Sequence, residues 1–171
     1  MYIIIAGGGV VGQNLTRELV KKHDVVVIDT DQRICERIYS NYGAVTINGN
    51  ATRIETLQEA GMAKCDIALG VMRYDSDNLA FSLLANDAGV EKILVRMREP
   101  EYRSAYRLAG ATNIGSTTAM LVNRFLIDIE QPDIRQVASI GDGEAEISII
   151  TIPRKAKHSG KTISEIVKNP G

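Results

Sequence analysis

The sequence predicts an α/β protein built on a doubly wound parallel sheet, and three observations lead to this prediction. Short runs of β-branched residues alternate with longer helical patterns, as in βαβ units. Most of the runs are continuously apolar, which is typical of strands covered by helices on both faces. A glycine-rich segment, residues 7–12, lies between the first run and the first helical pattern. Together these features indicate a Rossmann-type fold.

Strands and helices are expected to alternate along the chain. The predicted strands are residues 2–6, 25–29, 44–48, 67–71, 93–96 and a weaker one at 113–115. The predicted helices are residues 11–22, 32–42, 53–60, 75–88, 103–109 and 117–129. Four helical patterns are each followed by a glycine: Gly43, Gly61, Gly89 and Gly110. A glycine adopts the left-handed backbone that ends a helix without a Cβ penalty, so we expect these helices to end there.

The pattern changes near residue 131. We predict a turn at Asp142 and Gly143, a strand over residues 145–153 and a short helix over residues 162–168. One strand and one helix within the 41 residues of this segment are too few for an independent core. We therefore divide the chain into a Rossmann-type nucleotide-binding domain, residues 1–130, and a linker with the incomplete start of a C-terminal subdomain, residues 131–171.

Charge and cysteine content exclude several function classes. The 20 Lys and Arg residues nearly balance the 21 Asp and Glu residues, which argues against a nucleic-acid-binding arm or a polybasic membrane patch. Cys35 and Cys65 are far apart and form no CxxC pattern, so neither a zinc site nor a disulfide is indicated. No segment approaches the ~20 apolar residues of a membrane span. We expect a cytoplasmic protein without a metal site.

The glycine segment carries the strongest chemical signal. It reads Gly7-Gly8-Gly9-Val10-Val11-Gly12, a G-x-G-x-x-G pattern directly after a strand and at the start of a helix. In this pattern the first glycine permits a tight turn, the second lets a pyrophosphate approach the backbone, and the third allows close packing of helix on strand. Free N–H groups at the helix N-terminus favour bound phosphate. A glycine turn without a ligand is the alternative.

An acidic residue follows where a dinucleotide-binding motif requires one. Asp29 ends the second predicted strand, 22 residues after Gly7. Its carboxylate is expected to accept hydrogen bonds from an adenosine ribose and to repel a 2′-phosphate, which favours NAD over NADP. Thr30 and Asp31 come next and belong to the same predicted binding segment.

The turn after the third predicted strand has two interpretations. Asn50, Ala51 and Thr52 lie at the carboxyl end of that strand, where open α/β sheets bind ligands. They are candidates for contacts on the adenine side. A plain turn with Thr52 as the N-cap of the next helix is the alternative, since threonine is a common N-cap.

Polar residues also follow the fourth and fifth strands. Met72 and Arg73 come after the fourth strand, and Arg98 comes just past the fifth. An arginine at this edge would pair with phosphate, although a solvated surface arginine is the alternative. The loop after the fourth strand is also the predicted transmitter of a ligand-dependent change, through Arg73, Asp75, Asp77 and Asn78.

The sequence contains no clear candidate for a catalytic residue. A dehydrogenase needs a proton-transfer group near the nicotinamide, most often histidine. His23 precedes the second predicted strand, at the end of the sheet opposite the ligand crevice, and His158 lies in the C-terminal segment. We interpret both as ordinary surface residues and predict a nucleotide sensor without catalytic residues.

Several longer segments match a known family. They are the start from Met1 to Gly12, Val26-Val27-Ile28-Asp29-Thr30-Asp31, Gly49-Asn50-Ala51-Thr52, Asp75 with Asn78, and Arg98-Glu99-Pro100-Glu101-Tyr102. Through them residues 1–129 resemble the RCK or KTN regulatory domains of potassium channels and transporters, most of all the Trk-type potassium uptake regulators. The family usually has aspartate where Asn50 stands. Residues 144–167 look like the start of the family's C-terminal regulatory subdomain.

The resemblance implies a cytoplasmic regulatory subunit. It implies a homodimer or higher ring that binds NAD, NADH or an adenine nucleotide such as ATP or ADP and gates a membrane-embedded potassium transporter or channel. These ligands share the adenosine and phosphate groups that the motif reads, so the sequence does not choose among them. The cofactor-binding half of an NAD-dependent oxidoreductase remains the alternative function.

The last predicted helix of the first domain, residues 117–129, bears on assembly. It carries more apolar side chains than one face of a helix needs. The resemblance implies that this helix packs against a second subunit, and burial within its own domain is the alternative.

Overall fold

The computed structural model describes residues 1–130, 134–140, 145–150, 160, 162 and 164. The chain divides into two compact units, Met1–Thr118 and Ala119–Gly171. Within the described residues, no helix combines the length and the apolar character that crossing a bilayer requires.

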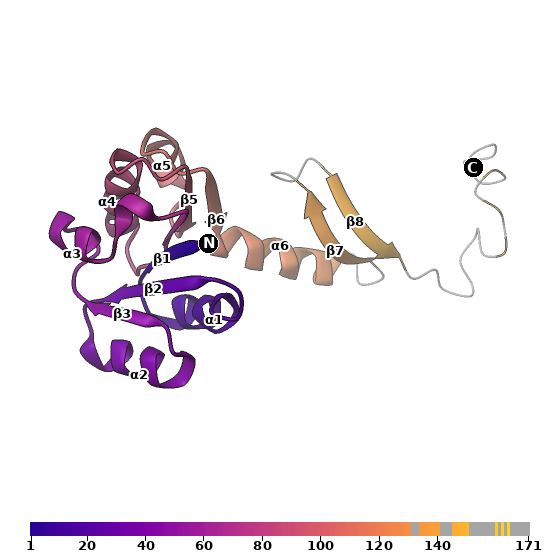
Figure 1. Cartoon of the computed structure of the whole chain (residues 1–171). Coiled ribbons are helices and arrows are strands. Elements are labelled where there is room, and N and C mark those ends of the chain that lie inside the picture. Colours follow the sequence, from indigo (N-terminus) through magenta and orange to yellow (C-terminus); the bar gives the residue numbers. More distant parts are fainter. Residues whose placement is uncertain (131–133, 141–144, 151–159, 161, 163, 165–171) are drawn as a thin grey trace. The chain divides into compact units, whose positions relative to one another are not determined.

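The first unit is built on a parallel sheet with strand order β3-β2-β1-β4-β5-β6 (Figure 1). Its strands are β1 (Tyr2–Ala6), β2 (Asp24–Asp29), β3 (Val45–Asn48), β4 (Ile67–Gly70), β5 (Lys92–Met97) and β6 (Asn113–Ser116). Every neighbouring pair in the sheet is parallel. The order runs outward in both directions from β1 and β4, so the topological switch point lies between these two strands. The predicted doubly wound sheet is confirmed.

The helices connect successive strands. They are α1 (Val10–Leu19), α2 (Gln32–Tyr42), α3 (Ile54–Glu59), α4 (Asp75–Asp87) and α5 (Arg103–Leu108), with short 3-10 helices η1 (Met62–Lys64) and η2 (Pro100–Tyr102). All lie within a few residues of the predicted ranges. Helix α1 ends earlier than predicted, because the amide of Lys22 bonds back only three residues, to the carbonyl of Leu19, and the chain turns there.

Four helical segments end at the glycines that the sequence predicted as helix ends. Gly43, Gly61, Gly89 and Gly110 have φ angles of 70°, 73°, 83° and 84°. These values lie in the left-handed region that side chains with a Cβ adopt at an energetic cost. The predicted role of these glycines at the ends of helical segments is confirmed.

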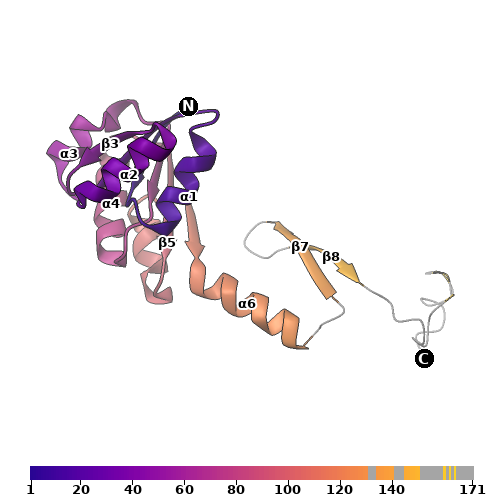
Figure 2. The same cartoon turned by 90° about the horizontal axis from the view of Figure 1, so that it is seen from below.

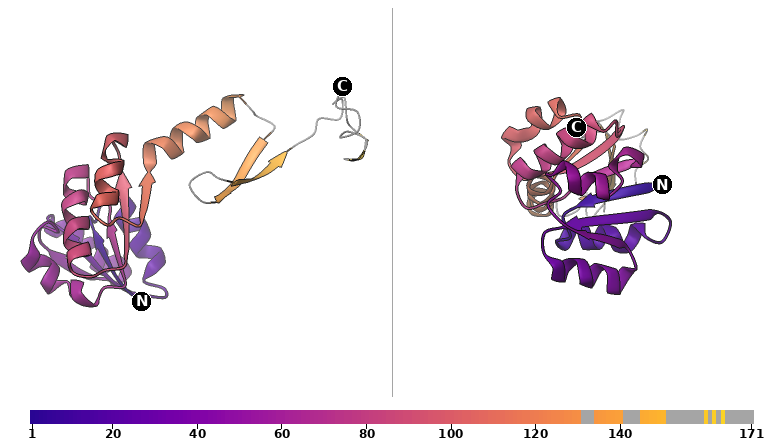
Figure 3. Two further views of the ribbon diagram at one scale, coloured as in Figure 1. Left: turned by 90° about the horizontal axis from the view of Figure 1, so that it is seen from above. Right: turned by 60° about the vertical axis from the view of Figure 1, so that its left-hand side comes forward.

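Helices cover both faces of the sheet, and each face has its own apolar core. Along β1, Ile4 and Ala6 join the core shared with α3, α4 and α5, whereas Ile3 and Ile5 join the core shared with α1 and α2. Figure 2 brings α1 and α2 to the front, and the left view of Figure 3 brings α4 and α5 to the front. Because successive strand residues point to opposite faces, a strand buried on both sides must be apolar throughout, as predicted.

The second unit contains most of α6 (Thr117–Glu130) and an antiparallel pair, β7 (Ile134–Ile140) and β8 (Ala145–Ile150). Strand β8 begins where a strand was predicted. Strand β7 was not predicted, because a register shift between Gln136 and Ala138 interrupts the alternation of apolar and polar residues. The predicted turn at 142–143, residues 151–153 and most of the predicted helix at 162–168 lie outside the described residues.

Candidate functional site

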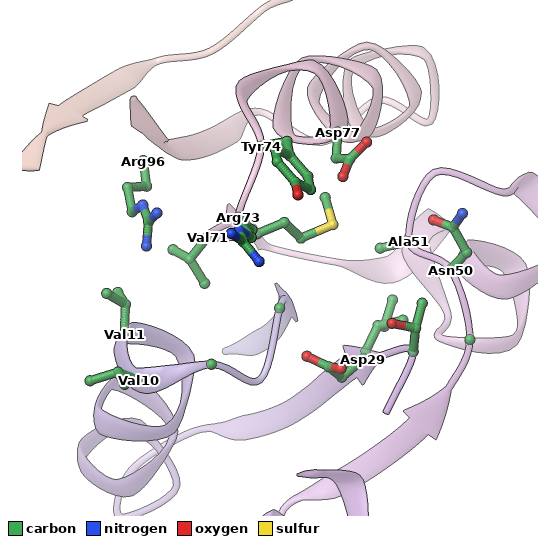
Figure 4. A pocket seen from close by; sticks show the side chains of 16 residues that line it. Val10, Val11, Asp29, Asn50, Ala51, Val71, Arg73, Tyr74, Asp77 and Arg96 are labelled. Atoms are coloured by element: carbon green, nitrogen blue, oxygen red, sulfur yellow. The ribbon is translucent and has the colours of Figure 1, made fainter. Parts of the chain in front are cut away.

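A cavity of about 420 Å³ opens at the carboxyl ends of the central strands (Figure 4). This volume lies within the range of about 300–1,000 Å³ that is usual for small-molecule sites. The lining residues are Gly7, Gly9, Val10, Val11, Ile28, Asp29, Thr30, Gly49, Asn50, Ala51, Val71, Met72, Arg73, Tyr74, Asp77 and Arg96. The cavity spans the switch point between β1 and β4, where open α/β sheets bind ligands.

The turn between β1 and α1 depends on glycines. Gly7 has a φ of +104°, and a Cβ there would lie 3.0 Å from the amide nitrogen of Met72. A Cβ on Gly12 would lie 1.9 Å from the carbonyl oxygen of Gly7, so no larger residue fits without moving the backbone. Gly9 differs, because nothing lies within 4 Å of the position of its Cβ. The turn therefore leaves an open approach to the backbone at Gly9.

Helix α1 begins at the edge of this opening. Its N-cap is Gly9, which has no side chain to bond the first amides of the helix. The first N–H groups of a helix have no partner within the helix, and the helix macrodipole makes this end positive. Val10 and Val11, the first two residues of α1, line the cavity. The cavity thus has a wall suited to an anion.

Asp29 lies at the end of β2 beside the glycine turn. Its carboxylate accepts hydrogen bonds from the amide of Gly8 at 2.7 Å and from the amide of Asp31 at 2.9 Å. These two bonds fix the orientation of the carboxylate. An ionised carboxylate has about four acceptor sites, so acceptor capacity remains for a ligand.

The turn after β3 lies beyond Asp29 at the same edge of the sheet. Asn50 and Ala51 line the cavity. The side-chain oxygen of Asn50 accepts bonds from the amide and the hydroxyl of Thr52, at 2.9 and 2.8 Å, which closes a tight turn. The N-cap of α3 is Arg53, so the alternative that made Thr52 the N-cap is wrong. Thr52 bonds to Asn50 within the turn and lies one residue before the N-cap of α3.

Residues from β4 and β5 form the other half of the cavity. Met72, Arg73 and Tyr74 follow β4, and Asp77 lies in the first turn of α4. Arg96 projects from β5 on the side of the cavity away from Asp29 and Asn50 (Figure 4). Its Nε atom is buried and has no hydrogen-bond partner among the described residues. A buried N–H group of a cation without a partner favours an anionic ligand.

Arg98, which we predicted as the phosphate-pairing arginine, lies outside this cavity. It lines a smaller neighbouring cavity of about 210 Å³ with Arg73, Tyr74, Asp75, Ser76, Glu99 and Tyr102. Its guanidinium donates to the carbonyl of Arg73 at 3.4 Å. The predicted end of β5, Arg96, is one residue too early, since the strand continues to Met97. The arginine that faces the cavity is therefore on the strand itself.

Buried side chains of α4 hold the ends of β4 and β5. The Asp75 carboxylate accepts bonds from the amides of Arg98 and Glu99, at 3.1 and 2.9 Å, and from the Tyr106 hydroxyl at 2.8 Å. Burial, together with the Asp75 carboxylate, raises the pKa of Tyr106 well above its ordinary value of 10.0. The hydroxyl therefore stays a donor, and its contribution to stability declines only as the pH rises above about 10.

The structure brings together most of the predicted site residues. Those that line the cavity are Gly7, Gly9, Val10, Val11, Asp29, Thr30, Asn50, Ala51, Met72 and Arg73. The amides of Gly8 and Asp31 donate hydrogen bonds to the Asp29 carboxylate, and Gly12 packs against the glycine turn. Tyr74 and Arg96 line the cavity but were not among the predicted site residues. The signal for Arg96 was a charged side chain directly after the apolar run 93–95.

Comparison with known sequences identifies the family. The sequence model of the TrkA-N domain matches residues 3–117, which is most of the chain. This chain belongs to the TrkA-N domain family. The match covers the parallel sheet of the first unit except Tyr2, and every described residue that lines the cavity.

Curated relatives of this TrkA-N chain carry related names. A Trk system potassium uptake protein TrkA homolog of Methanothermobacter thermautotrophicus is 29% identical over 167 residues, which is 97% of this chain and 77% of the relative. A protein of the same name from Archaeoglobus fulgidus is 30% identical over 171 residues. This match covers 97% of the present chain but only 39% of that relative.

Solved structures share the TrkA-N fold. The TrkA-N domain of the inner membrane protein ybaL from Escherichia coli has a TM-score of 0.69, with 18% identity over 73% of this chain and 93% of that one. The GsuK channel bound to NAD has a TM-score of 0.65, with 24% identity over 73% of this chain and 23% of that one. The Shewanella denitrificans Kef CTD in AMP-bound form has a TM-score of 0.62, with 22% identity over 77% of this chain and 81% of that one.

Proposed function

We propose that this TrkA-N chain is a nucleotide-binding regulatory subunit that gates a membrane potassium transporter or channel. The relatives are named as Trk system potassium uptake proteins, and these names support a role in potassium transport. One observation supports nucleotide binding above all others. A single cavity contains the glycine turn, the oriented Asp29 carboxylate and the Nε atom of Arg96, which has no partner among the described residues. In this proposal the protein is cytoplasmic and reaches the membrane through its transporter partner.

The proposed ligand is NAD or NADH, with ATP or ADP as the other candidates. The pyrophosphate would lie over Gly7 to Gly12, where the backbone at Gly9 is open and the N-terminus of α1 attracts negative charge. The ribose would bond Asp29, and the adenine would lie toward Asn50 and Ala51. Similar folds bound to NAD and to AMP support a ligand with an adenosine phosphate group.

The order of the strands supports this arrangement. Along the carboxyl edge of the sheet, Asn50 follows β3, Asp29 ends β2, the glycine turn follows β1, Met72 and Arg73 follow β4, and Arg96 belongs to β5. Four strand spacings of about 4.8 Å give an edge of roughly 19 Å between β3 and β5. A dinucleotide lying along this edge would meet each of these groups in turn.

A regulatory role is proposed rather than turnover. The bound nucleotide would act by its different affinity for two conformations of the protein and would not be consumed. The alternative is the cofactor-binding half of an NAD-dependent oxidoreductase. The names of the relatives favour the regulator. Hydride transfer from NADH by the purified protein would instead favour the oxidoreductase.

Dimerisation through α6 is part of the proposal. Six apolar side chains of this helix are exposed: Met120, Leu121, Val122, Phe125, Leu126 and Ile129. Exposed apolar surface of this kind marks a protein interface. Sedimentation at micromolar concentration is expected to give a dimer or larger ring, and Phe125→Glu is expected to shift it toward the monomer. A monomer for the unsubstituted protein would contradict the proposed interface.

Co-purification tests the function directly. Affinity-tagged protein isolated from detergent-solubilised membranes of its source cells is expected to retain a potassium transporter or channel subunit. Reciprocity then applies: the partner must change the relative affinities for NADH and ATP if these ligands favour different arrangements. No retained transporter, or nucleotide affinities that are the same with and without it, would contradict the regulatory role.

A further inference from the structure

Asn78 is a buried polar residue that bonds to two different walls of the cavity region. It lies in α4 and is 1% exposed. Its side-chain oxygen accepts a bond from the amide of Met72 at 2.8 Å, and its side-chain nitrogen donates to the carbonyls of Met72 and Arg96, each at 3.2 Å. The side chain thus uses its acceptor and both of its donor hydrogens on backbone groups.

These backbone groups belong to neighbouring strand ends. Met72 lies just beyond β4, and Arg96 lies near the end of β5. Val71 and Met72 pass behind the glycine turn, since a Cβ on Gly7 would lie about as close to Met72 as to Val71. Asn78 therefore ties the chain that backs the glycine turn to the strand that carries Arg96.

The room around Asn78 leaves its side chain little freedom. A Cβ on Gly70 would lie 3.3 Å from the side-chain oxygen of Asn78 and 3.2 Å from the ring of Phe81. Gly70 ends β4, so the strand and the helix approach closely at this point. The amide group is consequently held in one position by packing as well as by its bonds.

We propose that Asn78 is a positioning residue for the β4–β5 half of the cavity and thereby sets the affinity for the part of a nucleotide beyond its first phosphate. This inference rests on the proposed nucleotide-binding function. Asn78 does not line the cavity, so it acts through Met72 and Arg96, which do. The half formed by Asp29, Asn50 and Ala51 receives none of its three bonds.

The two halves predict different responses from two ligands. AMP consists of adenine, one ribose and one phosphate, which the glycine turn and the groups after β2 and β3 would hold. NADH adds a second phosphate, whose negative charge would meet Arg96 on β5, and continues to a second ribose and the nicotinamide, which would reach the groups after β4. A loss of order around Met72 and Arg96 should therefore weaken NADH binding and spare AMP binding.

The test is calorimetric titration of the whole chain with NADH and with AMP. Asn78→Asp keeps an oxygen for the Met72 amide but removes both donated bonds and sets a carboxylate against two carbonyls. Asn78→Ala removes all three bonds without adding a charge, and alanine favours the helix. Asn86→Asp is the matched control, because it adds the same charge to an exposed position of the same helix.

We expect both Asn78 variants to bind NADH about tenfold more weakly, because Asn78→Asp loses two of the hydrogen bonds that order the site and Asn78→Ala loses all three. AMP affinity should stay unchanged in both, and Asn86→Asp should match the unsubstituted protein for both ligands. If Asn78→Asp does not fold, Asn78→Ala gives the result.

Two results would overturn the inference. An unchanged ratio of the NADH and AMP dissociation constants, including equal weakening of both, would show that Asn78 contributes only to general stability. Failure of the unsubstituted protein to bind either ligand would overturn the proposed function and this inference with it.

Discussion

The two sides of the cavity are built by different means. On the β1–α1 side the backbone itself makes the surface, since Gly7 has a positive φ and Gly12 lets the helix approach the turn within contact distance. On the β4–β5 side the backbone is ordinary, and side chains of α4 hold it. Asp75 bonds the amides after β5, and Asn78 bonds the chain after β4.

Because of this difference, the two sides of the cavity should tolerate different substitutions. At Gly7 and Gly12 the backbone is packed too closely for a Cβ, so almost any substitution at these two positions disturbs the surface. A surface held by hydrogen bonds keeps its shape only while each donor and acceptor is paired, so the loss of one partner leaves another group unpaired. The first side should therefore respond to size, and the second to chemistry.

The largest effect is expected at Gly12. Alanine normally stabilises a helix relative to glycine, by up to about 1 kcal/mol. Here the added Cβ would lie 1.9 Å from the carbonyl oxygen of Gly7, and we expect Gly12→Ala to lower the free energy of unfolding by about 3 kcal/mol or more. Chemical denaturation measures this loss.

Gly9→Ala is the matched control in the same turn. Nothing lies within 4 Å of the position of its Cβ, so its cost should stay below about 1 kcal/mol, the difference between glycine and alanine at an N-cap. Equal losses for Gly12→Ala and Gly9→Ala would contradict the view that close packing shapes this side.

A smaller effect is expected at Asp75 on the other side. Asp75→Ala leaves the amides of Arg98 and Glu99 without their acceptor, whereas the Tyr106 hydroxyl keeps a bond to the backbone carbonyl of residue 75. Each unpaired group costs about 1–3 kcal/mol when it is buried. Because both amides are only part-buried, we expect the lower part of the sum, a loss of roughly 2–3 kcal/mol in the free energy of unfolding. Asp77→Ala controls for the loss of a negative charge at the start of α4.

Thermal and chemical unfolding of the two variants give the comparison. Asp77→Ala should lose less than about 1 kcal/mol, the usual size of a charge effect at a helix N-terminus. If it loses as much as Asp75→Ala, the helix dipole and not the hydrogen bonds holds this side of the cavity.

The same difference explains what the sequence could predict. The glycine pattern, Asp29 and the apolar strands act locally, and each has a spacing that can be read along the chain. The helix-ending glycines are equally local, which is why the first unit was predicted almost completely. The hairpin strand β7 was missed because a register shift breaks its alternation.

The second side depends on contacts between residues far apart in the sequence. Asp75 meets Arg98 and Tyr106 across 23 and 31 positions, and no local pattern announces such pairs. To predict Arg96 as the arginine at the cavity, one must know where β5 ends to within one residue, which sequence patterns resolve only to within several residues.

The most direct test of nucleotide binding is calorimetric titration of NADH and ADP into the unsubstituted protein, Asp29→Ala and Asp24→Ala. Asp24 is an exposed aspartate at the opposite end of β2, so it controls for the loss of a charge from this strand. Hydrogen bonds to a charged group contribute about 1.5–3 kcal/mol each. We expect the unsubstituted protein and Asp24→Ala to bind both ligands alike and Asp29→Ala to bind both at least about tenfold more weakly. Undiminished affinity in Asp29→Ala would contradict a nucleotide ribose at the end of β2.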